Sequence, residues 1–351
     1  MPKLKVGILA ATGTVGQRMI QLLERHPWFE VSAVAASDNS AGKNYAQSTR
    51  WLLETPIPEA VAKMTIQRSQ PGLDCDFVLS SLPTEVAEET ELQFARAGMP
   101  VLSNASSHRM KADVPLLIPE INPDHLNALQ VQKQRIGSSG FIVTNPNCSV
   151  IGLAFPMAAL LRRFGLEAVQ VVTMQALSGA GYPGVASLDI IDNVLPAIAM
   201  GGEDQKIETE PLKILGEWRD GKFVHAAPRI SAMTHRVNVR DGHLEAVSVK
   251  LATKASRAEV ETAIRDFKSP IDELQLPSAP RPVMALESHI GRPQPRLDRD
   301  RGQGMTIVVG PVHPCAVLDY KFRVLSHNTI RGAAGAAILN AELMYRKGLI
   351  G

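Results

Sequence analysis

The first half of the chain alternates short apolar runs with amphipathic segments. Apolar runs with the length of buried strands lie at residues 5–10, 31–36, 77–80 and 101–104. Segments with a helical period follow, among them 17–25 and a longer one ending at Arg96. This alternation is typical of a parallel sheet with helices on both faces. It predicts an α/β fold that begins with a Rossmann-type, doubly wound domain, assigned to residues 1–147.

The pattern changes after residue 147. A strand is predicted at 169–176 and a helix at 203–215, followed by segments of alternating polarity at 237–239, 245–252 and 306–309. Alternation of this kind suits a mixed or antiparallel sheet with one exposed face. We therefore predict a second, α+β domain over residues 148–327. The last helix, 329–347, begins with small residues, and we expect residues 328–351 to pack back onto the first domain.

A strand-to-helix corner joins the two halves. Phe141-Ile142-Val143 predicts a strand, Asn145-Pro146-Asn147 ends it, and a mostly apolar helix is predicted over 149–163. Cys148 lies at that corner. Backbone N–H groups in the first turn of a helix carry partial positive charge and favour a thiolate, so Cys148 is a candidate nucleophile. The alternative for a single cysteine is a buried structural residue.

Composition excludes several classes of protein. The chain has 351 residues, 45% hydrophobic and 21% charged, with a net charge of +2, which gives no reason to expect nucleic acid as a partner. The apolar run Leu4 to Ala11 is too short for a membrane or secretory segment, so we expect a cytoplasmic protein. Three widely spaced cysteines favour neither a disulfide framework nor a metal site, and we expect no bound metal.

A glycine turn after the first strand predicts a dinucleotide site. Ala11-Thr12-Gly13-Thr14-Val15-Gly16 separates that strand from its helix, and such a turn lets the backbone approach a pyrophosphate. Ala11 occupies the first glycine position of the fingerprint, so a plain tight turn is the alternative. At the end of the second strand, Ser37, Ser40 and Lys43 suit the 2′-phosphate of NADP, while Asp38 is also compatible with NAD.

A cysteine nucleophile that attacks an acyl phosphate or aldehyde needs a partner for acid and base chemistry. Four histidines are candidates by their surroundings, namely His225, His235, His243 and His313. His243 lies between a turn and a predicted strand, where it could point into a cleft. Spacing along the chain does not choose between the four.

Several motifs, taken in order, resemble the aspartate-semialdehyde dehydrogenase family over essentially the whole chain. They are 11–16 (ATGTVG), 145–149 (NPNCS), 175–181 (QALSGAG), 210–215 (EPLKIL) and Arg236 with His243. The loop Ser178 to Gly184 is similar to the archaeal and fungal branch of that family. One departure is Ala10, where the family commonly has glycine.

The resemblance implies an activity and a set of site residues. The activity is NADP-dependent, reversible reduction of 4-phospho-L-aspartate to L-aspartate 4-semialdehyde and inorganic phosphate. Catalytic roles fall to Cys148 as nucleophile, His243 as general acid and base, and Gln175. Substrate contacts are expected from Arg236 to the α-carboxylate, Glu210 to the ammonium, Lys213 and Arg109 to phosphate, and Asn147. Together with the glycine turn, the expected cofactor contacts are Thr12, Gly13, Thr14, Val15, Ser37, Ser40, Ser81, Leu82, Pro83, Ser178, Gly179 and Asn328.

Two other functions compete with this interpretation. A related acyl-phosphate reductase, such as N-acetyl-γ-glutamyl-phosphate reductase, would not need an acidic residue for a substrate ammonium. A non-catalytic nucleotide-sensing protein would not need Cys148, Gln175, Arg236 and His243 together. We also expect a homodimer or homotetramer, because the second sheet has a face that needs covering.

Overall fold

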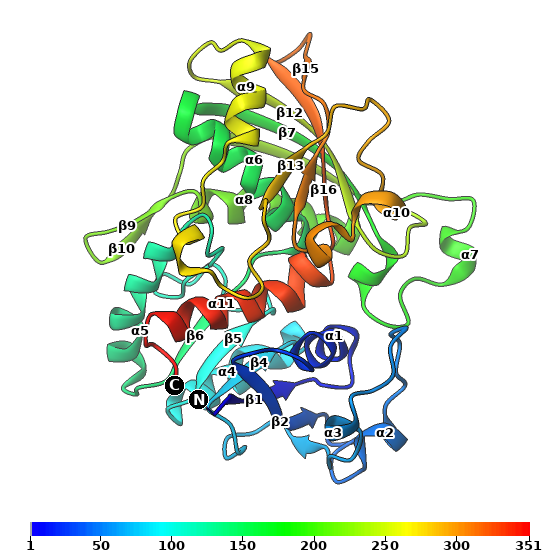
Figure 1. The fold of residues 1–351 in the computed structure, drawn as a ribbon, viewed down its shortest axis with the longest axis vertical. Helices are drawn as coiled ribbons and strands as arrows, with labels where there is room; N and C mark the ends of the chain where they lie inside the picture. The colour runs from blue at the N-terminus through cyan, green and yellow to red at the C-terminus, as the bar shows by residue number, and fades with distance from the viewer. Residues whose placement is uncertain (1) are drawn as a thin grey trace.

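The computed structural model describes residues 2–351 and contains two main sheets (Figure 1). The first sheet is parallel throughout, with strand order β3-β2-β1-β4-β5-β6. Its strands are β1 (Leu4–Leu9), β2 (Phe29–Ala36), β3 (Gln67–Arg68), β4 (Phe77–Ser80), β5 (Pro100–Ser103) and β6 (Phe141–Thr144). This order confirms the predicted Rossmann-type sheet.

Two helices of the first half were predicted from the pattern, α1 (Thr14–Leu23) after β1 and α4 (Thr84–Arg96) after β4. The other helices, which the pattern did not indicate, are α2 (Tyr45–Ser48), α3 (Glu59–Ala62), α5 (Leu129–Ile136) and the short 3-10 helix Pro123–Ala128. Helix α1 starts three residues earlier than predicted, directly after Gly13. A Cβ on Gly16 would lie 2.5 Å from the carbonyl oxygen of Ala10, so only glycine allows this close packing of helix and strand.

The second sheet has eight strands and is mixed, with β15 paired to β16 beside the order β13-β14-β16-β12-β7-β11-β8. The strands are β7 (Leu166–Gln175), β8 (Leu195–Pro196), β11 (Arg229–Arg236), β12 (His243–Leu251), β13 (Met284–Leu286), β14 (Ile307–Val309), β15 (His313–Pro314) and β16 (Tyr320–Ser326). The strand predicted at 237–239 is wrong. Strand β11 ends at Arg236, just before this segment. Residues 237–239 instead form backbone hydrogen bonds with Gln175, the last residue of β7, and with Leu177, just beyond it.

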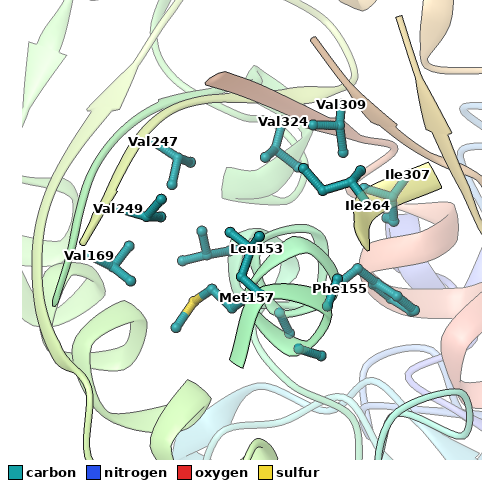
Figure 2. Close-up of a cluster of buried hydrophobic side chains, with 14 of the residues drawn as sticks. Leu153, Phe155, Met157, Val169, Val247, Val249, Ile264, Ile307, Val309 and Val324 are labelled. Atoms are coloured by element: carbon teal, nitrogen blue, oxygen red, sulfur yellow. The ribbon is translucent and has the colours of Figure 1, made fainter. Parts of the chain in front are cut away.

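Helix α6 (Cys148–Phe164) packs against the inner face of this sheet. Leu153 and Met157 lie opposite Val169, Val247 and Val249 of the curved sheet, and all five are buried (Figure 2). The remaining elements are α7 (Ser187–Ile190), α8 (Gly202–Ile214), β9 (Glu217–Arg219), β10 (Lys222–Val224), α9 (Arg257–Arg265) and α10 (Pro295–Asp298). Burial of this large apolar surface fixes the position of the helix whose first residue is Cys148.

The C-terminal segment lies between the two sheets (Figure 1). It consists of a π-helical turn, Ile330–Ala334, and α11 (Gly335–Arg346). Ala337 and Ile338 belong to the apolar core of the first sheet, whereas Ala336 belongs to that of the second. A Cβ on Gly332 would lie 2.8 Å from that of Cys148, so the π-helical turn passes directly against the candidate nucleophile.

Candidate active site

The corner between β6 and α6 places Cys148 at the first position of a helix. Asn147 caps that helix, because its side-chain oxygen accepts hydrogen bonds from the N–H groups of Ser149 and Val150. Cys148 as a whole residue is partly exposed and lines a cavity of about 440 Å³. Cys148 is thus a cavity residue rather than part of the packed core.

The structure selects one of the four candidate histidines. His243, the first residue of β12, lies with Nε2 3.1 Å from the Sγ atom of Cys148. Its other ring nitrogen accepts a hydrogen bond from the backbone N–H of Ala176, at 3.0 Å. Because Ala176 follows β7 directly, the corner that ends β7 orients the imidazole toward the sulfur.

The surroundings of Cys148 act against ionisation of the free site. Burial and the Glu203 carboxylate raise the pKa of Cys148 to about 12, while Arg236 and Arg109 act in the opposite direction. Burial and Glu203 therefore outweigh the effect of the helix start, which by itself favours a thiolate. The sequence could not indicate that a carboxylate from α8 would lie in the same cavity.

Arg236 and Gln175 lie side by side beneath the loop that follows β7. They are paired residues at the ends of the neighbouring strands β11 and β7. Arg236 donates a hydrogen bond of 2.7 Å to the carbonyl of Ala176. A Cβ on Gly179 would lie 2.8 Å from Arg236 Nη1 and 3.1 Å from His243 Cε1, which explains the need for glycine in this loop.

The cavity brings together predicted residues from both halves of the chain. The predicted residues that line it are Thr14, Val15, Ser81, Leu82, Pro83, Arg109, Asn147, Cys148, Ser178, Gly179 and Asn328. Asn328 links two of its walls, because its side chain donates to Ser178 Oγ and accepts from the N–H of Gly242. Thr12 and Gly13 lie in the turn between β1 and α1, directly before the cavity residue Thr14. Ser37 and Ser40 follow the end of β2.

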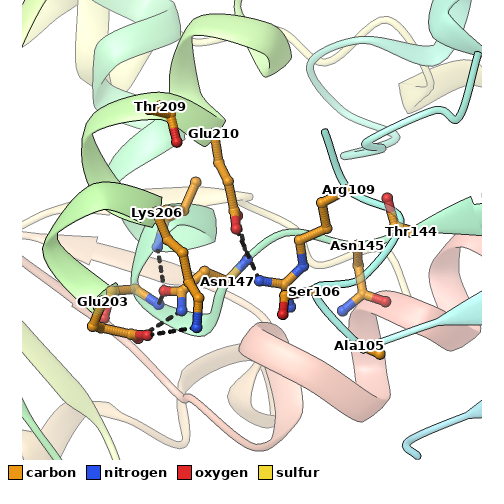
Figure 3. A network of polar contacts seen from close by, with 12 residues as sticks. Ala105, Ser106, Arg109, Thr144, Asn145, Asn147, Glu203, Lys206, Thr209 and Glu210 are labelled. Atoms are coloured by element: carbon orange, nitrogen blue, oxygen red, sulfur yellow. Dashed lines mark hydrogen bonds and ion pairs between the residues drawn. The ribbon is translucent and has the colours of Figure 1, made fainter. Parts of the chain in front are cut away.

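Three predicted substrate residues, Arg236, Glu210 and Lys213, do not line the cavity, and neither do Gln175 and His243. Glu210 uses one carboxylate oxygen for Arg109, at 2.9 Å, and the other for the backbone N–H of Asn147, at 2.7 Å (Figure 3). Lys213 donates from Nζ to the carbonyls of Arg109, Lys111 and Val114, at 2.7 to 2.8 Å. These contacts use all three N–H bonds of the ammonium, so the predicted direct contact of Lys213 with phosphate does not fit this geometry.

Glu203 and Lys206, which the sequence analysis missed, occupy the cavity instead. Glu203 accepts a hydrogen bond of 2.6 Å from the Asn147 side chain and forms an ion pair with Lys206 at 3.1 Å (Figure 3). The signal was present, because Glu203-x-x-Lys206 repeats the spacing of Glu210-x-x-Lys213 seven residues earlier. Both units fall on nearly the same face of α8.

The first-domain edge fits a phosphorylated dinucleotide. The free N–H groups at the start of α1 face the end of β1, the usual place for a pyrophosphate. Arg68 on β3 lies beside the end of β2 and pairs with the exposed Asp38 at 3.2 Å. Arg68, which was not predicted from the sequence, adds a cation where Ser37 and Ser40 were predicted to contact a 2′-phosphate.

Ala10, which stands where the family commonly has glycine, has a backbone conformation that favours glycine. Its φ angle is +57°, in the left-handed region that favours glycine. The alanine therefore holds a strained turn directly before the dinucleotide-binding turn.

Within residues 2–351, no group of three or more His, Cys, Asp or Glu side chains is arranged to hold a metal ion. The helices in the same range are all too short or too polar to cross a membrane.

A Rossmann domain, a second domain with a mixed sheet and a cysteine–histidine pair at their junction define a dehydrogenase of the semialdehyde dehydrogenase class. Two family descriptions match the chain: "Semialdehyde dehydrogenase, NAD binding domain" over residues 5–129 and "Semialdehyde dehydrogenase, dimerisation domain" over residues 157–331.

Individual proteins similar to this chain show which semialdehyde dehydrogenase family it belongs to. The chain is 48% identical over 346 residues to an aspartate-semialdehyde dehydrogenase of Archaeoglobus fulgidus, covering 98% of this chain and 99% of the relative. It is 44% identical to that of Aspergillus fumigatus, covering 99% of each. The crystal structure of aspartate semialdehyde dehydrogenase with NADP from Candida albicans superposes with a TM-score of 0.90 at 40% identity, covering 99% of this chain and 100% of that one. The chain belongs to the aspartate-semialdehyde dehydrogenase family, which confirms the predicted resemblance to archaeal and fungal members.

Proposed function

We propose that the chain catalyses the NADP-dependent, reversible conversion of 4-phospho-L-aspartate to L-aspartate 4-semialdehyde and inorganic phosphate. This step belongs to the biosynthesis of the amino acids derived from aspartate. The observation that carries the proposal is the pair formed by Cys148 Sγ and His243 Nε2, 3.1 Å apart, at the cavity between the two domains. Relatives of 38 to 48% identity bear the same enzyme name.

The cofactor is NADP in this proposal. The Candida albicans structure, 40% identical, is described as a complex with NADP. In this chain the turn Thr12 to Val15, the Ser81 to Pro83 segment, Ser178, Gly179 and Asn328 would hold the dinucleotide, with Ser37, Ser40 and Arg68 at the 2′-phosphate. Bound NADPH would supply the hydride.

The substrate contacts follow from the charges around Cys148. Arg236 would pair with the α-carboxylate through its guanidinium, and Gln175 beside it would orient the acyl group. Glu203 would receive the substrate ammonium, and Lys206 with Arg109 would bind phosphate, since these three side chains line the cavity. Glu210 and Lys213 would support Arg109 and Asn147 from beneath rather than touch the substrate.

The chemistry assigned to Cys148 is nucleophilic. Its thiolate would attack the acyl phosphate and expel phosphate, giving a thioester, with His243 as the general acid and base. Reduction of the thioester gives a tetrahedral thiohemiacetal, which collapses to the aldehyde and returns the thiolate.

A direct assay separates this function from its alternatives. Phosphate-dependent reduction of NADP should be faster with L-aspartate 4-semialdehyde than with N-acetyl-L-glutamate 5-semialdehyde, and the reverse preference would overturn the substrate assignment. Cys148→Ala should abolish turnover while NADPH still quenches protein fluorescence with unchanged affinity. A Cys148→Ala protein with substantial activity would show that the nucleophile is wrongly assigned.

We also propose a homo-oligomer that acts in the cytoplasm. Residues 1–147 would bind the cofactor, 148–327 would carry the catalytic and oligomer contacts, and 328–351 would close onto the first domain. Large apolar side chains are exposed on the segment after Gly181 and on β11, including Leu188 at 89%, Met200 at 97% and Met233 at 60%. The three cysteines are free thiols, as is usual in a reducing compartment. Light scattering should give a dimer or tetramer, and a monomer would contradict the proposal.

A further inference from the structure

A second cavity, of about 510 Å³, lies beside the one that contains Cys148. The two cavities share Thr14, Ser178, Gly181 and Thr329 in their walls. None of the other predicted catalytic, substrate or cofactor residues lines the second cavity, so it is separate from the proposed active site. Its volume, and its place between α1 and the loops of the second sheet, are typical of a small-molecule site.

Arg18, on α1, brings a positive charge to this cavity that its surroundings do not compensate. Its Nη1 atom donates a hydrogen bond of 2.7 Å to the Gln21 side chain, whereas Nε is buried without a hydrogen-bond partner. Among residues 2–351, no carboxylate lies within ion-pair distance of Arg18. Because an unpaired N–H of a buried guanidinium is costly, Arg18 fits an anionic group in the cavity.

The two other arginines of the cavity are already engaged. Arg240 forms ion pairs with Glu54, at 2.8 Å, and with Asp241, at 3.1 Å. Arg299 donates a hydrogen bond of 3.1 Å to the backbone carbonyl of Asp241. Arg18 is therefore the arginine that is available to a ligand.

Asp300 is the matching carboxylate, because it has no close cationic partner. Its side chain is 74% exposed and lies 3.8 Å both from Arg299 Nε and from His327 Nε2, beyond hydrogen-bond distance. Burial lowers the pKa of His327 to about 4, so this imidazole is neutral at neutral pH. Asp300 can thus receive a positively charged group from the cavity.

The cavity also has an apolar part, formed by Leu52, Leu53, Leu177 and Ile330. An aliphatic side chain would lie against this surface without leaving a polar group unpaired. A simple anion such as inorganic phosphate would gain Arg18 but would meet the carboxylates of Asp241 and Asp300. A ligand that carries both charges and an apolar chain uses all three parts of the wall.

We propose that this cavity binds an α-amino acid with an aliphatic side chain, whose carboxylate pairs with Arg18 and whose ammonium pairs with Asp300. Asp300 follows α10 and Arg18 belongs to α1, so the ligand joins the second half of the chain to the Rossmann-type sheet.

The proposed NADP site joins the same two parts, because its contacts include the glycine turn before α1 and the pair Ser178 and Asn328. Two ligands that each hold these parts together favour the same arrangement of the protein. The amino acid and NADP should therefore tighten each other's binding by an equal factor.

Calorimetric titration of the full chain with L-leucine tests the site. The matched probes are 4-methylpentanoate, which lacks the ammonium, and 3-methylbutylamine, which lacks the carboxylate. L-Leucine should bind at least about tenfold more tightly than either, because each probe loses one charge-assisted contact. Equal binding of L-leucine and 4-methylpentanoate would reduce the cavity to a simple anion site, and absence of L-leucine binding up to about 10 mM would overturn the proposal.

Variants locate the bound amino acid. Arg18→Met should weaken L-leucine binding at least about tenfold, and Asp300→Asn should weaken binding of L-leucine but not of 4-methylpentanoate. Glu203→Gln, in the cavity that contains Cys148, is the control and should keep the wild-type affinity. Loss of L-leucine binding in Glu203→Gln but not in Arg18→Met would place the amino acid in the active site and contradict the proposal.

Quenching of protein fluorescence by NADPH measures the coupling between the two sites. Saturating L-leucine should lower the Kd of NADPH about fivefold or more in the wild type and leave it unchanged in Arg18→Met. An NADPH affinity that does not respond to L-leucine in the wild type would contradict the bridging position. These measurements do not depend on turnover, so absence of reductase activity would count against the proposed function alone.

Discussion

Helix α8 carries the spacing Glu-x-x-Lys twice, and the two copies have different surroundings. Glu203 and Lys206, in its first turns, line the cavity that contains Cys148. Glu210 and Lys213, about two turns later, are 2% and 1% exposed and bond to Arg109, Asn147 and the backbone of 109–114. The first copy can meet a ligand, and the second supports the residues that do.

The difference arises from what lies opposite the helix. Residues seven apart occupy nearly the same face of a helix, so the helical period cannot separate the two copies. The start of α8 lies over the open cavity, whereas its later turns pack on the segment that contains Arg109. Whether a charged residue can contact a ligand or instead supports other residues therefore depends on its neighbours, and the tertiary fold determines those neighbours.

The largest effect on folding is expected at Glu210. Glu210→Gln removes the buried partner of Arg109, and loss of one member of a buried ion pair costs about 3–5 kcal/mol. Urea unfolding should show this decrease in the free energy of unfolding. Glu203→Gln is the matched control and should cost less than about 1 kcal/mol, because glutamine keeps an oxygen that accepts from the Asn147 side chain, and the lost partner, Lys206, is partly exposed to solvent. Equal costs would mean that the two copies do not differ in role.

Lys213 should make the free energy of unfolding depend on pH. Burial lowers the pKa of Lys213 to about 7 from its ordinary 10.5. Between these values the unfolded chain binds more protons than the folded one, so this group makes folding more favourable as the pH rises. The destabilisation caused by Lys213→Met, about 2–4 kcal/mol from three unsatisfied carbonyls, should therefore grow from about pH 7 to 9.

Unfolding curves of the wild type and Lys213→Met across this pH range would measure that growth. A cost of Lys213→Met that shrinks as the pH rises would reverse the expected sign.

The sequence was informative where local chemistry decides the structure. The strands β1, β2, β4, β5 and β6, the helix that starts at Cys148 and the glycine turn before α1 follow from periodicity and turn residues, and the structure confirms them, whereas the two-residue strand β3 was not predicted. Cys148 and His243 are 95 residues apart along the chain, at the starts of helix α6 and strand β12, and family resemblance rather than spacing selected His243. Glu203, Lys206 and Arg68 were missed because their roles depend on contacts between elements that no local pattern records.

A smaller effect, on substrate binding, is expected at Lys206. Lys206→Met removes one cation from the cavity that holds Cys148, and loss of a charge-assisted hydrogen bond of about 1.5–3 kcal/mol predicts a KM for phosphate raised about 10- to 100-fold. The KM for NADP and the free energy of unfolding should stay close to those of the wild type. A normal KM for phosphate would place its site elsewhere.

The smallest effect is expected on the acidity of Cys148 in Glu203→Gln. Next to burial, the Glu203 carboxylate is the main cause that raises the pKa of this thiol. Its removal should lower that pKa, so alkylation of Cys148 by iodoacetamide at about pH 8 should become a few-fold faster, since only the thiolate reacts. Glu210→Gln, assayed under conditions where it remains folded, is the control and should leave the rate nearly unchanged.

The substrate ammonium would neutralise Glu203 in the same way, so a substrate analogue that leaves Cys148 free should also lower the pKa of the thiol in the wild type but not in Glu203→Gln. An unchanged alkylation rate in Glu203→Gln would show that Glu203 does not control the charge of the nucleophile, and the first copy would then differ from the second only in exposure.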